Sequence, residues 1–197
     1  MSKKFFNEKA KDWDNIVQHD SEKITEVITN IEIINSPNIL DVGSGTGVLI
    51  PYLINKFGSK SKITAVDFAE NMIAVSREKH SQYKNIDYIV GDIYSLQLAK
   101  NTYDIIFCYS VFPHFTDKLG ILKKFKYCLK EKGIVVIFHS QSRKAINNLH
   151  KTAGAEVERD NLPSGVELAN MAKKIGYEVV QIIDNDELYV VKIRRNT

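Results

Sequence analysis

Apolar residues along the chain follow two different spacings. Short runs rich in β-branched residues predict strands, whereas apolar positions three and four residues apart predict helices. The first five predicted strands span residues 38–42, 62–67, 86–90, 103–109 and 134–138. Segments with helical spacing alternate with these runs, and this alternation is typical of a parallel α/β sheet.

Capping and turn residues indicate where the predicted helices begin and end. An N-cap side chain accepts a backbone hydrogen bond at the start of a helix, and glycine often ends one. We expect a helix capped by Asp20 or Ser21, one ending at Gly58, one over residues 70–82, and one from Asp117 to Gly133.

The last third of the chain has a different pattern. A polar segment over residues 140–161 follows the fifth strand, and Ser164 is placed to begin a helix. Residues 177–183 and 188–193 then read as two strands whose connection is too short for a crossover helix, so they must form an antiparallel hairpin. The prediction is an α/β fold with seven strands, mostly parallel, with a C-terminal antiparallel hairpin, in one domain over residues 1–197.

Composition excludes several classes of protein. Hydrophobic residues make up 44% and charged residues 26% of the 197 positions, as in soluble globular chains. No apolar run approaches the roughly 20 residues that a membrane helix needs, and the charged N-terminus lacks a signal-peptide core. The two cysteines, Cys108 and Cys128, lie within apolar patterns, which argues against a disulfide framework. We therefore expect a cytoplasmic protein with no membrane partner.

The charge pattern argues against a nucleic-acid partner. Twenty-seven basic side chains face 24 acidic ones, a net charge of +3, and the two signs alternate along the chain. No block of basic residues marks a nucleic-acid footprint. The charges are better explained as a solvated surface.

A cluster of glycines lies between the first predicted strand and the helix after it. Three of the ten glycines in the chain fall within five residues, at Gly43, Gly45 and Gly47. Glycine lets the backbone turn sharply and approach a ligand, and the amides of the following helix N-terminus can bind a polar group. A tight structural turn would use the same residues, so the cluster alone is a moderate signal.

Two acidic residues strengthen that signal. Asp67 ends the second predicted strand and Asp92 follows the third. Ligands of open α/β sheets bind outside the carboxyl ends of the strands, where an acid after the second strand can accept both hydroxyls of a ribose. The two carboxylates are therefore expected to flank one crevice.

Four segments resemble, in order, the motifs of class I S-adenosylmethionine-dependent methyltransferases: Asp41-Val-Gly-Ser-Gly-Thr-Gly47, Ala65-Val-Asp67-Phe, Gly91-Asp92-Ile and Tyr103-Asp-Ile-Ile-Phe. Within the opening residues 1–20, the run Phe5-Phe-Asn-Glu-Lys-Ala-Lys-Asp-Trp13-Asp also resembles the N-terminal cap segment of many small members. The resemblance implies a Rossmann-like sheet with helices on both faces. It also implies S-adenosylmethionine as the cofactor and methyl transfer as the activity.

The resemblance further implies a role for each residue of the cofactor site. The ribose hydroxyls are expected at Asp67 and the adenine amine at Asp92, with the adenine ring packed on Phe68, Met72 and Ile93. The methionine moiety is expected on the loop of Gly43, Ser44, Gly45 and Gly47, with its ammonium near Asp41 and the backbone of Tyr109.

Candidates for the methyl-acceptor side follow the fourth and fifth strands. His114 is placed where family members that act on small molecules often carry a histidine, as a base or an acceptor contact; a loop histidine bonded to backbone is the plain alternative. His139 and Arg143 follow the fifth strand, and His150 lies about two helical turns beyond Arg143. Arg143 could pair with an anionic acceptor. A metal bound by His139 and His150 with Asp184 or Asp186 would have no recognised ligand spacing behind it, and a polar surface helix would also explain the segment.

The candidate functions differ in what else the sequence should contain. The nicotinamide-binding fingerprint needs a third small residue, and the chain has Val48 or Ile50 at that position. Enzymes that methylate amino groups of bases or glutamine carry an Asn/Asp-Pro-Pro-aromatic run that is absent after Tyr109. Once the predicted strands and helices are counted, only residues 1–20 and 140–161 remain to enclose an acceptor. This favours a small-molecule acceptor. A catalytically silent cofactor-binding regulatory subunit stays an alternative, and the oligomeric state is open.

Overall fold

The structure is a computed structural model that describes residues 3–32, 34–152 and 160–196. Its seven strands belong to a mixed, mostly parallel sheet. The chain forms two compact units, residues 2–97 and 98–197. The prediction of a single domain stays a prediction.

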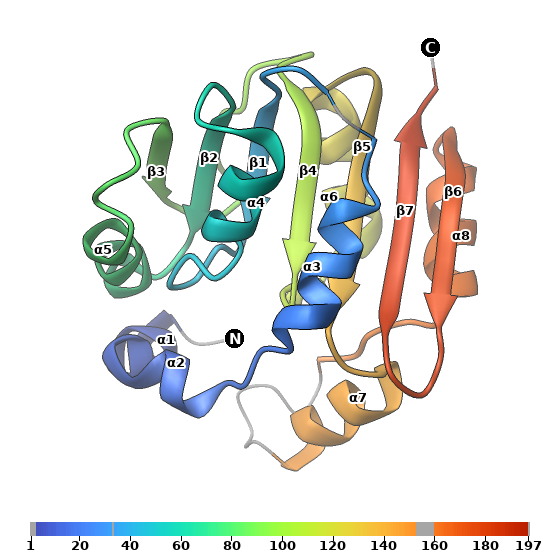
Figure 1. Cartoon of the computed structure of the whole chain (residues 1–197). Coiled ribbons are helices and arrows are strands. Elements are labelled where there is room, and N and C mark those ends of the chain that lie inside the picture. The colour runs from blue at the N-terminus through green and yellow to red at the C-terminus, as the bar shows by residue number, and fades with distance from the viewer. Residues whose placement is uncertain (1–2, 33, 153–159, 197) are drawn as a thin grey trace. The chain divides into compact units, whose positions relative to one another are not determined.

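The unit of residues 2–97 contains three parallel strands in the order β3-β2-β1 (Figure 1). These are β1 (Asn38–Val42), β2 (Lys62–Asp67) and β3 (Ile86–Val90), each with the predicted bounds. Asp67 pairs in register with Val90, so the ends of β2 and β3 lie side by side. This register therefore agrees with the prediction that Asp67, at the end of β2, and Asp92, just after β3, flank one crevice.

The described residues of this unit also form six helical segments: α1 (Lys3–Lys9), η1 (Ala10–Asp12), α2 (Trp13–Ile16), α3 (Ser21–Thr29), α4 (Ile50–Phe57) and α5 (Glu70–Lys79). Asp20 caps α3 by accepting a hydrogen bond from the Lys23 amide at 3.1 Å, as predicted. The helix α4 ends at Gly58, whose φ of 78° suits glycine. The helix α5 stops at Lys79, three residues before the predicted end.

The N-terminal helices pack on α5. Phe6 and Trp13 cover a buried cluster that includes Ala69 and Met72, and the rings of Phe6 and Trp13 lie 5.2 Å apart. Figure 1 shows α1 and α2 beside α5. Residues 3–16 thus contact the helix that follows Asp67.

The unit of residues 98–197 contains β4 (Tyr103–Tyr109), β5 (Leu129–His139), β6 (Tyr177–Asp184) and β7 (Tyr189–Arg195) in the order β4-β5-β7-β6. The strands β4 and β5 are parallel, whereas β7 runs antiparallel to both β5 and β6. The predicted C-terminal hairpin is confirmed.

One predicted boundary in this unit is wrong. The helix expected to run from Asp117 to Gly133 ends at Cys128, and β5 begins at Leu129 rather than at Ile134. Leu129 has helical spacing from Leu122 and Phe125, which suggested a longer helix. In the fold it pairs with the first residue of β4 instead, and an irregularity in the β4–β5 register absorbs the extra residues.

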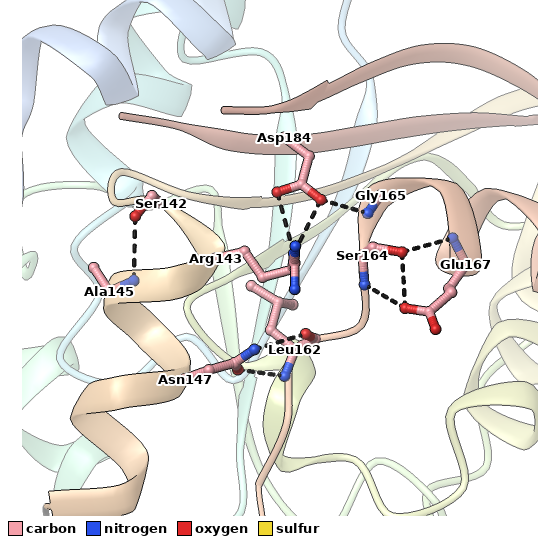
Figure 2. A network of polar contacts seen from close by, with 9 residues as sticks. All are labelled: Ser142, Arg143, Ala145, Asn147, Leu162, Ser164, Gly165, Glu167 and Asp184. Carbon is pink, nitrogen blue, oxygen red and sulfur yellow. Dashed lines mark hydrogen bonds and ion pairs between the residues drawn. The ribbon is translucent and has the colours of Figure 1, made fainter. Parts of the chain in front are cut away.

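The other helices of this unit are η2 (Phe112–His114), α6 (Lys118–Cys128), α7 (Arg143–Thr152) and α8 (Gly165–Lys174). Ser164 caps α8 in a capping box with Glu167, as Figure 2 shows, which confirms the predicted start. The helix α7 forms within the polar segment that follows β5. Figure 1 shows α7 beyond the end of β5 and near the turn between β6 and β7.

Candidate functional site

The loop between β1 and α4 holds its three glycines in left-handed backbone conformations. Gly43, Gly45 and Gly47 have φ values of 66°, 54° and 83°, a region that residues with a Cβ rarely adopt. A Cβ on Gly47 would collide with Ser76 and His80, whereas a Cβ on Gly45 would meet nothing within 4 Å. Gly47 therefore permits close packing on the α5 side, and the space beside Gly45 is open to a ligand.

Asp67 joins this loop to the end of β2. Its Oδ2 accepts a hydrogen bond from the Gly45 amide and its Oδ1 one from the Ala69 amide, both at 2.9 Å. The side chain is buried, and burial raises its pKa against the opposing effect of the amide hydrogen bonds. Each carboxylate oxygen has a second lone pair, so both can still accept a hydroxyl of a ligand.

Asp41 is a buried ionisable side chain with a carboxylate oxygen that is unsatisfied within the described part of the chain. It is 2% exposed, and its Oδ2 has no hydrogen-bond partner among the described residues. Burial, and then the nearby charge of Asp67, raise the pKa of Asp41 to about 7. The buried Oγ of Ser44 in the adjacent loop likewise lacks a described partner. Orphaned buried polar atoms call for a missing partner, and a cationic ammonium beside Asp41 and Ser44 fits these residues.

The residues predicted to bind adenine lie at and just beyond the ends of β2 and β3. Asp92 is exposed, and its Oδ1 accepts a hydrogen bond from the Tyr94 amide at 2.9 Å. Ile93 is buried, whereas Phe68 is half-buried, with its ring 5.6 Å from that of Phe6. Met72 is buried under the N-terminal helices. Their contacts with an adenine ring stay predictions.

The N-terminal segment reaches the glycine loop through a side chain that sequence reasoning missed. Asp14 accepts a hydrogen bond from the Thr46 hydroxyl at 2.5 Å and another from the Lys79 ammonium. Burial raises the pKa of Asp14, but the hydrogen bonds from Lys79 and Thr46 outweigh burial and leave that pKa lowered. Nothing in the spacing of three residues so far apart along the chain indicates this contact.

Among the residues predicted for the acceptor side, the structure brings His114 and His150 together around Asp160. The Nδ1 of His114 lies 2.6 Å from Oδ2 of Asp160, and the Nδ1 of His150 lies 3.1 Å from the backbone oxygen of Asp160. The two imidazole ring centroids are 5.0 Å apart. Asp160 was not among the predicted residues, because it lies in a polar segment with neither a motif nor a period.

His139, at the end of β5, is buried beside Tyr189. Its side chain is 1% exposed, its ring nitrogens have no hydrogen-bond partner among the described residues, and the same holds for the Tyr189 hydroxyl. His139 and Tyr189 pair in register across β5 and β7. Burial, and then the charges of His114 and His150, lower the pKa of His139 to about 3, so this imidazole is neutral.

Arg143 binds within the protein, in the network that Figure 2 shows. Its Nε donates to the Asp184 carboxylate at 3.0 Å, and the same carboxylate accepts the Gly165 amide at 2.9 Å. Arg143 and His150 lie two turns apart on α7 as predicted, yet they contact different partners. The predicted pairing of Arg143 with an anionic acceptor stays a prediction.

Asn147 on α7 forms hydrogen bonds to the segment that precedes α8. Its side-chain amide donates to the Leu162 carbonyl at 3.0 Å, and its Oδ1 accepts the Leu162 amide at 2.8 Å (Figure 2). Leu162 is two residues beyond Asp160, so this clamp helps to hold Asp160 near α7.

Tyr109, at the end of β4, is buried and forms a 2.8 Å hydrogen bond through its hydroxyl with Ser140. The predicted role of Tyr109 uses its backbone and stays a prediction. Within the described ranges, no three or more His, Cys, Asp or Glu side chains are grouped to hold a metal ion. No helix of the described residues is long and apolar enough to cross a membrane.

The sheet and the loop geometry define a Rossmann-like nucleotide-binding fold of the class I S-adenosylmethionine-dependent methyltransferase kind. The sequence model of the methyltransferase domain family matches residues 35–189, and the chain therefore belongs to that family. S-adenosylmethionine is the cofactor of the family, and the open space at Gly45 with the orphaned Asp41 and Ser44 atoms fits it.

Known proteins resemble the chain in sequence and in fold. A malonyl-[acyl-carrier protein] O-methyltransferase of Bacillus anthracis is 34% identical over 128 residues, 65% of this chain and 46% of that protein. A demethylmenaquinone methyltransferase of Staphylococcus epidermidis is 30% identical over 124 residues, 62% of this chain and 52% of that protein. The chain thus spans about half the length of these curated relatives.

Among solved structures, a SAM-dependent methyltransferase from Aquifex aeolicus has a TM-score of 0.74 at 22% identity. The match covers 95% of this chain and 97% of that one. The predicted fold class, a mostly parallel seven-stranded sheet that ends in an antiparallel hairpin, is confirmed.

Proposed function

We propose that this chain transfers a methyl group from S-adenosylmethionine to a small-molecule acceptor. The observation that carries the proposal is the hydrogen bond between Asp67 and the Gly45 amide, which joins the acid of β2 to an open glycine loop. Membership of the methyltransferase domain family supports it independently.

The proposed cofactor roles follow the sequence motifs. The ammonium would bind at Asp41 and the backbone of Tyr109, the rest of the methionine moiety on the loop of Gly43, Ser44, Gly45 and Gly47, the ribose at Asp67, and the adenine at Asp92 with Phe68, Met72 and Ile93. We assign His114, His139, His150 and Arg143 to the acceptor side.

When bound, S-adenosylmethionine supplies an activated methyl group on a sulfonium. The residues of the chain would bind the two reactants, align them and exclude water. Such effects lower the reaction barrier by about 7–11 kcal/mol in well-oriented reactions. Asp41 and Asp67 would add charge-assisted hydrogen bonds at the ammonium and at the ribose of the cofactor.

A small acceptor is favoured by the curated relatives, whose names specify malonyl-[acyl-carrier protein] and demethylmenaquinone. A cytoplasmic location and the absence of a nucleic-acid partner belong to the same proposal. Neither of the two cysteines forms a disulfide, which agrees with a reducing compartment.

Calorimetry with S-adenosylhomocysteine tests the cofactor assignment. Asp67→Ala should weaken binding by about 1.5–3 kcal/mol, as the loss of charged hydrogen bonds does. The matched control is Asp87→Ala, which removes an exposed carboxylate from β3. Far-ultraviolet circular dichroism checks that both variants fold. Equal affinity in folded Asp67→Ala and wild type would remove the ribose assignment.

Two alternative functions give different results in the same experiments. A nicotinamide-dependent oxidoreductase would bind NADH in place of S-adenosylhomocysteine. A catalytically silent regulatory subunit would bind S-adenosylhomocysteine tightly but transfer no methyl group to any member of a broad acceptor panel.

A further inference from the structure

We propose that His114 is the general base of this protein, that Asp160 is its positioning residue, and that the acceptor is a neutral molecule methylated at a weakly acidic O–H, N–H or C–H group. The inference rests on the proposed methyl transfer and deepens it. It excludes a thiolate or a carboxylate, which needs no base at the moment of attack.

The contact between Asp160 and His114 is that of a carboxylate orienting a base. The 2.6 Å separation of Nδ1 and Oδ2 joins two side chains that are only 17% and 14% exposed. An imidazole that donates its Nδ1–H to a carboxylate carries its lone pair on Nε2, and the carboxylate stabilises the imidazolium that forms when Nε2 takes a proton. This arrangement gives His114 the tautomer and the counter-ion that a base requires.

The partners of the three histidines distinguish His114 from His139 and His150 as the base. The described residues provide a carboxylate at hydrogen-bond distance to His114 but not to His139 or His150. Burial lowers the pKa of His150, and burial lowers that of His139 to about 3. Lys118 also lies near this pair among the described residues: it interacts with Asp160 and donates to the carbonyls of Pro113 and Phe115. The Asp160 carboxylate thus marks His114, and not its two histidine neighbours, as the proposed acceptor of the proton.

The polar groups near this pair suit an uncharged acceptor. His139 and Tyr189 carry three buried nitrogen and oxygen atoms without a described partner, and leaving a buried polar atom without a partner is destabilising. Burial keeps this imidazole and this phenol neutral. The nearby cations are already engaged, because Arg143 binds Asp184 and Lys118 binds carbonyls. Neutral donors and acceptors match a neutral acceptor better than an anion.

The proposed step balances as follows. The acceptor proton moves to Nε2 of His114, and the electron pair of the broken X–H bond forms the new bond to the methyl carbon. The electron pair of the broken carbon–sulfur bond stays on sulfur, and S-adenosylhomocysteine leaves. The imidazolium, paired with the Asp160 carboxylate, then releases its proton to water.

Two measurements on the full chain test the pair. Nitrogen-15 NMR of the histidine side chains should find His114 in the Nδ1–H tautomer in wild type, and a tautomer mixture in Asp160→Asn. The control is Asp186→Asn, which changes an exposed carboxylate in the turn between β6 and β7 and should leave the His114 signals unchanged. A His114 that carries its proton on Nε2 in wild type would overturn the pair.

The second measurement is methylation of a probe panel with S-adenosylmethionine labelled in its methyl group. The panel consists of para-substituted phenols of graded acidity, an aniline, a 1,3-diketone, a thiophenol and a benzoate. Asp160→Asn should lower kcat on the least acidic phenol by about 100-fold or more, as loss of general base catalysis does, with a smaller loss as the phenol becomes more acidic. A uniform loss across the phenols would indicate only a structural role and would contradict the assignment.

The panel also separates this inference from the proposed function. If S-adenosylhomocysteine fails to bind wild type, the proposed function fails. If it binds while only the thiophenol or the benzoate is methylated, or no member is, the neutral protic acceptor is refuted and cofactor binding stands. Unchanged affinity of Asp160→Asn for S-adenosylhomocysteine is expected, because Asp160 is assigned to the acceptor side.

Discussion

Asp41 should make cofactor binding depend on pH, and Asp41→Asn should remove that dependence. The wild-type carboxyl is fully buried and has a pKa of about 7. If the cofactor ammonium binds the ionised form, the protein must release a proton whenever Asp41 is protonated before binding. Acidification therefore weakens binding through this group.

The magnitude follows from that pKa. The apparent Kd rises by the factor 1 + 10^(pKa − pH), which is about 11 at about pH 6 and about 1.1 at about pH 8 for a pKa of about 7. The expected loss of affinity is therefore about tenfold, or about 1.4 kcal/mol. Asp67 also has a raised pKa, so the difference between wild type and Asp41→Asn isolates the contribution of Asp41.

Calorimetry with S-adenosylhomocysteine at the two pH values, in buffers of different ionisation enthalpy, measures both the affinity and the protons released. Asp87→Asn serves as the matched control, since it neutralises an exposed carboxylate in β3. Affinity curves for wild type and Asp41→Asn that stay parallel between the two pH values would refute the placement of the ammonium at Asp41.

Three further predictions concern stability. Asp41→Asn should raise the free energy of unfolding of the cofactor-free protein by up to about 4 kcal/mol at about pH 8, and by less at about pH 5. The reason is that the pKa of this carboxyl rises from 3.8 to about 7 on folding, so its stabilising contribution is lost as the pH rises through 7. Urea unfolding at both pH values measures the gain, and a larger gain at the lower pH would contradict the prediction. Gly47→Ala should destabilise by more than Gly58→Ala in thermal melts, because both have positive φ but only the added methyl at position 47 meets atoms within 4 Å; equal losses would contradict the packing role. Arg143→Met should cost no more than about 1 kcal/mol of folding free energy, since the Arg143 side chain is 40% exposed. A double-mutant cycle with Asp184→Asn tests whether that cost comes from their ion pair.

The strands of this protein were predictable because each is a short apolar run between turn residues. Strands β1 and β2 follow Pro37 and Gly58 closely, so local chemistry alone sets where they begin. The start of β5 was not predictable in this way. Leu129 has helical spacing from the residues before it, and only its pairing with Tyr103 places it in a strand.

The residues of the candidate site also fall into a group that local sequence patterns predict and a group that they do not. The glycine loop and Asp67 lie at strand ends that the sequence predicts, and the structure joins them by a hydrogen bond. The contacts of Asp14 with Thr46 and of Asp160 with His114 connect residues 32 and 46 positions apart, and neither Asp14 nor Asp160 belongs to a strand-end motif. Such pairs depend on how the chain folds back on itself, which no local pattern contains.

A crystal structure with S-adenosylhomocysteine bound tests the central claim most directly. We predict both ribose hydroxyls within hydrogen-bond distance of Asp67, with the amino group beside Asp41 and the space next to Gly45 filled. A nucleoside bound elsewhere, or a loop at Gly45 left empty at saturating ligand, would contradict the account.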